Sequence, residues 1–306
     1  MDRDMHPADR EGDLSAHLIC TRPERSGTSG RVQPEAAQNS TNGPVREPEH
    51  EDELRTLRPV RIGRQIYSIS HDEIRTMYDI GRFRVVRDQD LVSFRYRQNE
   101  GLMKQDVQAI FAQGLIEKKT VWTGRNKEVN TFIALTKSGK TLLKRQDGVS
   151  SNQALYTGFV KPAELHHDAA IYPVFQREAA QIEKDGGRIR RVVLDYELKK
   201  RAYSPLAKAK ALPPAEFAKQ QAEIARQFGL KVINGHLTLP DLRIEYETRS
   251  GVATHIDLEV ATKDYHGSHA AEKAAAGFKI YAAPDVAGRL NRVLEEREIT
   301  AEILCL

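Results

Sequence analysis

The order of local signals in the first half of the chain constrains its fold more than any other sequence feature. Ser70 and Glu73 form a capping box, which predicts that a helix starts here. Two more helices are predicted at 88–96 and 103–113, and a last one at 136–144. What lies between the third and the fourth helix therefore decides which helical fold this segment adopts.

Two strand-like runs, 115–122 and 129–135, occupy that interval. They are separated by Thr-Gly-Arg-Asn-Lys, in which Gly124 and Asn126 tolerate a positive φ, so the pattern predicts a β-hairpin with a charged tip. The stretches GLIEKK and FIALTKSGKTLL also resemble the wing and the final helix of many bacterial winged-helix proteins. Three helices, a hairpin and a closing helix in this order predict a winged helix-turn-helix over residues 58–146.

A winged helix predicts DNA as the partner. The third helix exposes Lys104, Gln105 and Gln108, and the wing tip carries Arg125 and Lys127. The recognition helix of such a fold enters the major groove, while basic wing residues contact phosphates. The same domain holds 18 Lys and Arg against 9 Asp and Glu, which favours a polyanionic partner, although an ordinary solvated surface can show this balance too.

The rest of the chain divides by composition. Residues 1–57 hold 7 Lys and Arg against 12 Asp and Glu, and apolar residues are too sparse there to offset the cost of ordering, so a disordered tail is predicted. Residues 147–157 are predicted to be a polar linker. Residues 158–306 alternate predicted helices and strands, among them a β-branched strand at 188–198, which indicates a mixed α/β domain. No apolar run is long enough to cross a membrane, and a cytoplasmic protein is expected; a homodimer is compatible with the sequence.

Two acidic residues near the ends of neighbouring strands are the candidate metal-binding residues of the second domain. Asp241 follows Pro240 where the first strand begins, and Glu259 lies near the end of the strand 253–261. Alternation along that strand places Asp257, Glu259 and Ala261 on one face. Two carboxylates brought together in this way can bind Mg²⁺, which prefers oxygen ligands. A solvated hairpin that carries acids by chance is the simpler alternative.

This arrangement resembles the PD-(D/E)xK nuclease core, in which Pro-Asp is followed by a hairpin and then by Glu-x-Lys. Pro240, Asp241 and Glu259 match, whereas Ala261 occupies the lysine position. The resemblance implies that a lysine is supplied from the following helix, with Lys273 as first candidate and Lys263, just past the strand, as second. It also implies an early-helix acid at Glu164 or Asp168 and a strand acid at Glu197. The expected fold is a restriction-endonuclease-like α/β/α domain, with Asp241 and Glu259 as metal ligands and Asp241, Glu259 and Lys273 as catalytic residues.

A second resemblance covers roughly residues 60–285. The segments LHHDAAIYPVFQREA, DLEVAT and AAEKAAAGFKIYA are similar to the bacterial plasmid replication–relaxation family, which joins a winged helix to a nuclease-like domain. The resemblance implies a DNA-binding protein of a plasmid or other mobile element with an Mg²⁺-dependent nuclease. Because Ala261 departs from the nuclease pattern, a non-enzymatic transcription or replication regulator with a degenerate nuclease fold stays open.

The histidine positions do not indicate a metal or catalytic site. His166 and His167 lie on a predicted helix, where packing and surface exposure explain them more simply than ligation does. Tyr265, His266 and His269 follow the acidic strand and are predicted to belong to a loop.

Overall fold

The computed structural model describes residues 55–123, 128–159, 161–263, 265–297, 299, 301 and 303–305, all within one compact unit that runs from Ser40 to Leu306. The predicted tail lies outside the described residues except for 55–57, where Arg55 Nη2 pairs with Asp106 Oδ2 at 3.4 Å. The wing tip, with Arg125 and Lys127, also lies outside them. No described helix is long and apolar enough to span a bilayer.

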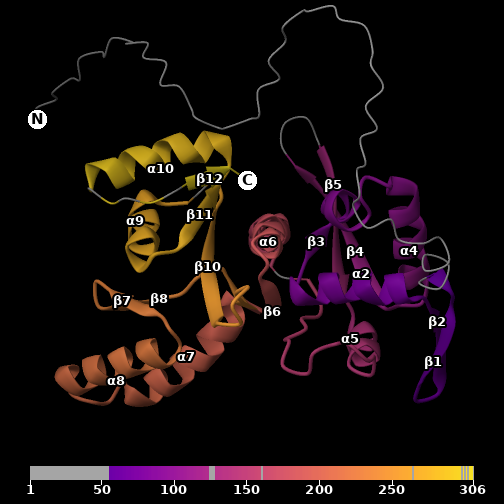
Figure 1. Ribbon diagram of the computed structural model, residues 1–306, viewed down its shortest axis with the longest axis horizontal. Helices are drawn as coiled ribbons and strands as arrows, with labels where there is room; N and C mark the ends of the chain where they lie inside the picture. Colours follow the sequence, from indigo (N-terminus) through magenta and orange to yellow (C-terminus); the bar gives the residue numbers. More distant parts are fainter. Residues whose placement is uncertain are drawn as a thin grey trace, which may run out of the picture. The chain divides into compact units, whose positions relative to one another are not determined.

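Residues 58–143 form a winged helix-turn-helix preceded by a β-hairpin (Figure 1). The hairpin was not predicted from the sequence; the helices and the wing strands were. The elements in chain order are β1 (Arg58–Ile62), β2 (Gln65–Ile69), α2 (His71–Arg82), β3 (Val86–Arg87), α3 (Asp88–Asp90), the π-helical turn η1 (Leu91–Arg95), α4 (Glu100–Ala112), β4 (Ile116–Thr123), β5 (Glu128–Leu135) and α5 (Lys137–Leu143).

Local hydrogen bonds explain where these helices begin. Ser70 Oγ accepts from the Glu73 amide at 3.2 Å, and Glu73 Oε2 accepts from the Ser70 amide at 2.7 Å, which confirms the capping box at the start of α2. Thr136 caps α5, because its hydroxyl oxygen accepts from the Gly139 amide at 3.1 Å. The Thr136 amide in turn donates to the Leu115 carbonyl at 3.0 Å, which holds α5 against the turn that precedes the wing.

This close approach predicts a large effect of a small substitution. A Cβ added at Gly139 would lie 2.2 Å from the Leu115 carbonyl oxygen, so we expect Gly139→Ala to lower the free energy of unfolding by about 2 kcal/mol despite the better helix propensity of alanine. Gly288 is the matched control, because it is also helical and a Cβ there meets nothing within 4 Å. Gly288→Ala should stabilise by up to about 1 kcal/mol. Urea unfolding followed by circular dichroism measures both, and a Gly139→Ala protein as stable as wild type would contradict the prediction.

The C-terminal part is a mixed α/β domain with helices on both faces of one sheet, as predicted. Its five-stranded sheet has the order β12-β11-β10-β9-β6, in which β6, β9 and β10 are antiparallel neighbours and β10, β11 and β12 run parallel. Helix α6 packs on one face of the sheet, and α9 and α10 pack on the other (Figure 1). The elements are α6 (Leu165–Lys184) after the short turn η2 (Pro162–Glu164), β6 (Arg188–Leu194), β9 (Leu242–Glu247), β10 (Ala253–Ala261), α9 (Gly267–Ala276), β11 (Lys279–Ala282), α10 (Pro284–Glu296) and β12 (Ile303–Cys305).

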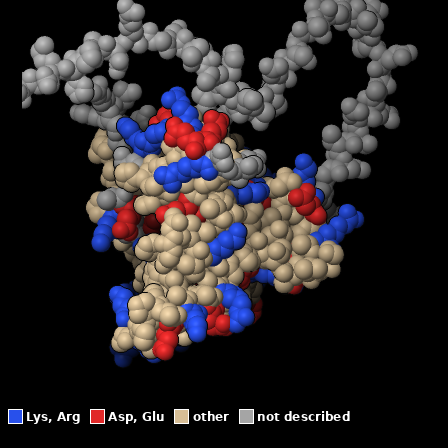
Figure 2. All heavy atoms as spheres, turned by 90° about the vertical axis from the view of Figure 1, so that its left-hand side faces the viewer, with Lys and Arg blue, Asp and Glu red and all other residues tan. Residues whose placement is uncertain are grey.

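A helical insertion separates β6 from β9. It consists of α7 (Asp195–Ala209), α8 (Pro214–Gln227) and the small hairpin of β7 (Lys231–Ile233) and β8 (His236–Thr238). In Figure 2, basic and acidic side chains both lie at the lower end of the molecule, where Figure 1 places α7 and α8. The sequence predicted a strand to residue 198, but it ends at Leu194 because Asp195 and Glu197 form the acidic first turn of α7. Glu197 is therefore not the strand acid that the resemblance implied.

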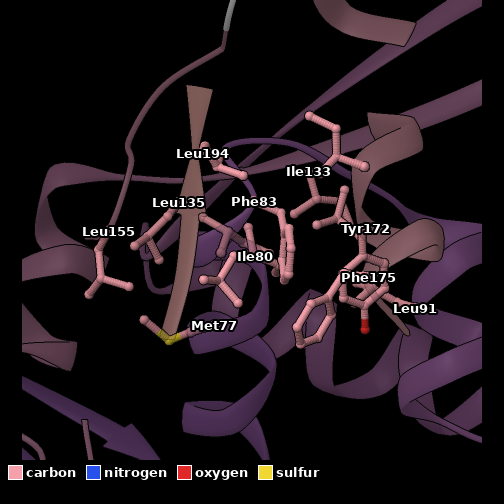
Figure 3. Close-up of a cluster of buried hydrophobic side chains, with 14 of the residues drawn as sticks. Met77, Ile80, Phe83, Leu91, Ile133, Leu135, Leu155, Tyr172, Phe175 and Leu194 are labelled. Atoms are coloured by element: carbon pink, nitrogen blue, oxygen red, sulfur yellow. The ribbon is translucent and has the colours of Figure 1, made fainter. Parts of the chain in front are cut away.

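One hydrophobic core joins the winged helix to the C-terminal domain. Phe83, at the end of α2, packs edge-on against Tyr172 of α6 with ring centroids 5.2 Å apart (Figure 3). Residues of the predicted linker take part too: Leu155 is buried in the same core, and the Gln153 amide group binds both the backbone N–H and the carbonyl of Val192. The orientation of α6 thus depends on contacts from both parts of the chain.

Candidate functional site

Asp241 and Glu259 lie side by side at one end of the sheet. The antiparallel register of β9 and β10 pairs Leu242 with Leu258, so the next step along both strands places Asp241 opposite Glu259. The Glu259 side chain projects from the sheet face that α9 covers, and both carboxylates are nearly buried. The Val260 amide donates to Asp241 Oδ2 at 2.9 Å, which fixes one carboxylate relative to the neighbouring strand.

Lys273 of α9 contacts this pair of carboxylates through Glu259. Its Nζ lies 2.8 Å from Glu259 Oε2 and also donates to the Leu239 carbonyl at 2.5 Å. Ala261 is fully buried under the alanines of α9, so its small side chain lets the helix approach closely enough for Lys273 to reach the strand. The alternative Lys263 makes no ion pair with either carboxylate among the described residues.

The site shifts the pKa values of the two acids in opposite directions. Burial and the negative charge of Asp241 raise the pKa of Glu259 to about 7, although Lys273 and the Tyr265 hydroxyl, which lies 2.8 Å from Glu259 Oε1, favour its ionised form. Burial opposes ionisation of Asp241 as well, but His167 and Lys273 outweigh it and lower the pKa of that carboxyl. The sequence had assigned Tyr265 to a loop, and no local signal indicated this contact.

His167 is the residue that sequence reasoning misjudged. Its Nε2 lies 3.2 Å from Asp241 Oδ2 and its Nδ1 3.4 Å from Asp168 Oδ1. Burial disfavours the charged ring, yet the two carboxylates raise the pKa of His167 to about 10, so the ring is an imidazolium at neutral pH. Its neighbour His166 does pack as expected, edge-on against Phe132.

The acid on the early part of α6 is Asp168 rather than Glu164. Asp168 reaches Asp241 through His167, and Arg84 Nη1 from the winged helix lies 3.0 Å from Asp168 Oδ2. Glu164 is exposed at the start of α6. Arg84 itself has a positive φ of 62°, so the end of α2 adopts an uncommon conformation where it meets the site.

The oxygen donors of Asp241 and Glu259 are of the kind that hard divalent cations prefer. Among the described residues, every hydrogen bond to the Asp241 carboxylate reaches Oδ2, which leaves Oδ1 for a ligand, and each Glu259 oxygen retains a second lone pair. A cation would also relieve the repulsion that raises the Glu259 pKa. Within the described part of the chain, however, no cluster of three or more His, Cys, Asp or Glu side chains is arranged as a ready metal site, so water or phosphate oxygens would complete the coordination.

The described DNA-binding candidates lie together on α4. Lys104, Gln105 and Gln108 are exposed and line a groove of 780 Å³ between α4, η1 and the wing sheet. Lys104 pairs with Glu100 at 2.6 Å, and Gln108 accepts from Lys118 of β4 at 3.3 Å. This groove is thus lined by polar side chains from the predicted recognition helix and by the wing strands.

The wing adds an aromatic residue that the sequence analysis did not single out. Trp122 is the single tryptophan of the chain and is 66% exposed. It lies opposite Val129 on the sheet face that also carries Lys118 and Thr131, two residues of the α4 groove.

Comparisons with known proteins add little to this geometry. No protein-family model matches the chain, and no curated protein matches it. A crystal structure of Bacillus subtilis PadR in complex with operator DNA matches at 14% sequence identity and a TM-score of 0.22, over 51% of this chain and 93% of that chain.

Proposed function

We propose that this chain is a DNA-binding protein of a plasmid or another mobile element whose C-terminal domain hydrolyses DNA phosphodiesters with the help of Mg²⁺. The observation that carries the proposal is the convergence of Asp241, Glu259 and Lys273, which are far apart in the sequence, on one nearly buried site. The assignment to a mobile element depends on the resemblance to the plasmid replication–relaxation family.

Each residue has a distinct role in this proposal. Asp241 and Glu259 would hold Mg²⁺, which supplies Lewis-acid charge to the phosphoryl oxygens. The ammonium of Lys273, 2.8 Å from Glu259, would stabilise the negative charge that develops on the phosphoryl oxygens. The His167 imidazolium and the Tyr265 hydroxyl hold Asp241 Oδ2 and Glu259 Oε1 in place, so the carboxylates are oriented before substrate binds.

The winged helix supports the choice of DNA as substrate. It presents Lys104, Gln105 and Gln108 on one face of α4, and glutamine side chains can read adenine in the major groove. Recognition by the winged helix would place the DNA on the protein before cleavage, because both parts share one core.

Metal-dependent stabilisation tests the proposal most directly. We expect Mg²⁺ or Mn²⁺ to raise the melting temperature of the wild type, since a ligand at a hundred times its Kd adds about 3 kcal/mol of stability. Asp241→Asn and Glu259→Gln should lose this increase, whereas Lys273→Ala should retain some of it but lose cleavage of supercoiled plasmid. Glu164→Gln is the matched control, because it removes an exposed acid outside the site. A wild-type protein that both metals leave unchanged would contradict the proposal.

A second candidate function has its own support. Ala261 replaces the expected lysine, and both Glu259 oxygens already accept hydrogen bonds from Tyr265 and Lys273. These features favour a DNA-binding regulator in which the cluster of Asp241, Glu259 and Lys273 stabilises the fold. Sequence-specific DNA binding without metal response and without cleavage in Mg²⁺, Mn²⁺ or EDTA would support this second function.

A further inference from the structure

Helix α7 carries a stripe of alternating aromatic and basic side chains that starts beside the candidate active site. The α7 stripe consists of Tyr196, Lys199, Lys200, Tyr203 and Lys210, whose helical spacing puts them on one face. The opposite face of the helix is buried through Leu198, Ala202, Leu206 and Ala209. Tyr196 and Tyr203 are 57% and 44% exposed, which is unusual for two large aromatic residues on one surface.

The stripe is physically continuous with the candidate site. The amide of Asp195, the first residue of α7, donates to the Asp241 carbonyl at 3.0 Å. The Arg84 guanidinium that pairs with Asp168 lies over the Tyr196 ring, 5.6 Å from its centroid. Lys199 pairs with Asp195 at 2.5 Å, so the first turn of α7 brings a lysine to the entrance of the site.

The far end of the stripe borders an apolar hollow. Tyr203 and Lys210 line a cavity of 400 Å³ together with Phe217 of α8 and Leu237 of β8. Residues 196–210 hold five Lys and Arg against one Glu. Among the described residues, no carboxylate pairs with Lys200 or Lys210, so their charges are available to an anion.

We propose that the α7 stripe binds single-stranded DNA and leads it to the Asp241–Glu259–Lys273 site. The two tyrosines are seven residues apart, or about 10 Å along the helix, which leaves room for bases to stack on each. Lys200 and Lys210 contact the phosphates between and beyond them. A duplex fits this surface less well, because its bases are stacked on each other and not available to the tyrosines. The inference rests on the proposed function, since it supplies that site with its substrate strand.

The test is fluorescence anisotropy with the full chain in EDTA and two probes, a labelled oligothymidine and a labelled duplex. We expect Tyr203→Ala to weaken oligothymidine binding about 5- to 100-fold, whereas Tyr203→Phe, which keeps the stacking ring, should bind like the wild type. Lys200→Ala should weaken binding and flatten its dependence on salt by about 0.7 in the logarithmic slope. Lys208→Ala, an exposed lysine on another face of α7, is the matched control and should have a smaller effect. Duplex binding should not change in any of these variants.

The outcomes separate this inference from the proposed function. If the α7 stripe binds oligothymidine but the protein cleaves no DNA, the single-strand site is supported and the proposed nuclease function is rejected. Metal-dependent cleavage with stripe variants that still bind oligothymidine like the wild type would reject the inference and keep the nuclease. A wild type without affinity for oligothymidine, or a Lys208→Ala effect equal to that of Lys200→Ala, would overturn it. Circular dichroism melting excludes unfolding as the cause, and Tyr203→Phe provides the folded comparison.

Discussion

Replacing Arg243 with methionine is expected to lower the free energy of unfolding by about 3–5 kcal/mol, which is the largest effect on stability that we predict. Arg243 is 5% exposed and Asp257 9% exposed. The guanidinium binds the carboxylate in a fork, with Nε–Oδ1 at 2.6 Å and Nη2–Oδ2 at 2.7 Å. It also donates to the carbonyls of Phe228 and Gly229, so it ties the end of α8 to the sheet. Without it, a buried carboxylate and two carbonyls lose their partners.

Two variants make this prediction specific. Arg243→Met combined with Asp257→Leu should recover part of the lost stability, because it removes the unpaired charge while the two carbonyls stay unpartnered. Arg226→Met is the matched control, since Arg226 pairs with Glu223 on the exposed surface of α8 and such pairs contribute less than about 1 kcal/mol. Urea unfolding measures all three proteins. An Arg243→Met protein no less stable than Arg226→Met would show that the buried pair does not hold the insertion.

The second large effect concerns pH. The pKa of Glu259 is raised to about 7 in the folded protein from an ordinary value of 4.5, so the folded state binds this proton more tightly than the unfolded chain does. Stability from this residue is therefore fully present below about pH 4.5 and is lost as pH rises towards 7. This difference between the folded and the unfolded pKa corresponds to roughly 3 kcal/mol. The lowered pKa of Asp241 acts in the opposite direction, and only as pH falls below its ordinary value of 3.8.

The comparison with Glu259→Gln isolates this contribution from all other titrating groups. We expect the wild type to lose about 3 kcal/mol relative to Glu259→Gln between pH 4.5 and pH 8 in EDTA, as measured by chemical unfolding at each pH. Mg²⁺ should reduce this loss, because a cation beside both carboxylates removes the repulsion that raises the pKa. Parallel stability curves for the two proteins across this range would show that Glu259 titrates normally.

Much of the local structure follows from the sequence because the forces that set it act within a few residues. The capping box at Ser70, the wing strands and the bounds of β10 at Ala253–Ala261 agree with the structure. Alternation along β10 also placed Asp257 and Glu259 on one face correctly. The strand predicted to residue 198 is too long, because its β-branched residues end at Val193 and Asp195 and Glu197 form the acidic first turn of α7.

Local pattern cannot tell two acids on the same face apart, and here the tertiary structure decided their roles. The register of β9 places Arg243 opposite Asp257 and Asp241 next to Glu259, so one acid becomes half of a buried ion pair and the other becomes part of the candidate site. Likewise, the sequence around His167 predicted only packing or surface exposure, whereas in the folded protein α6 places this side chain beside Asp241, 74 positions further along the chain. The sequence alone determined which residue types and which elements are present. Packing of α6 and α9 on the sheet determined which carboxylates acquire charged partners, because those contacts depend on distances between elements that no local period encodes.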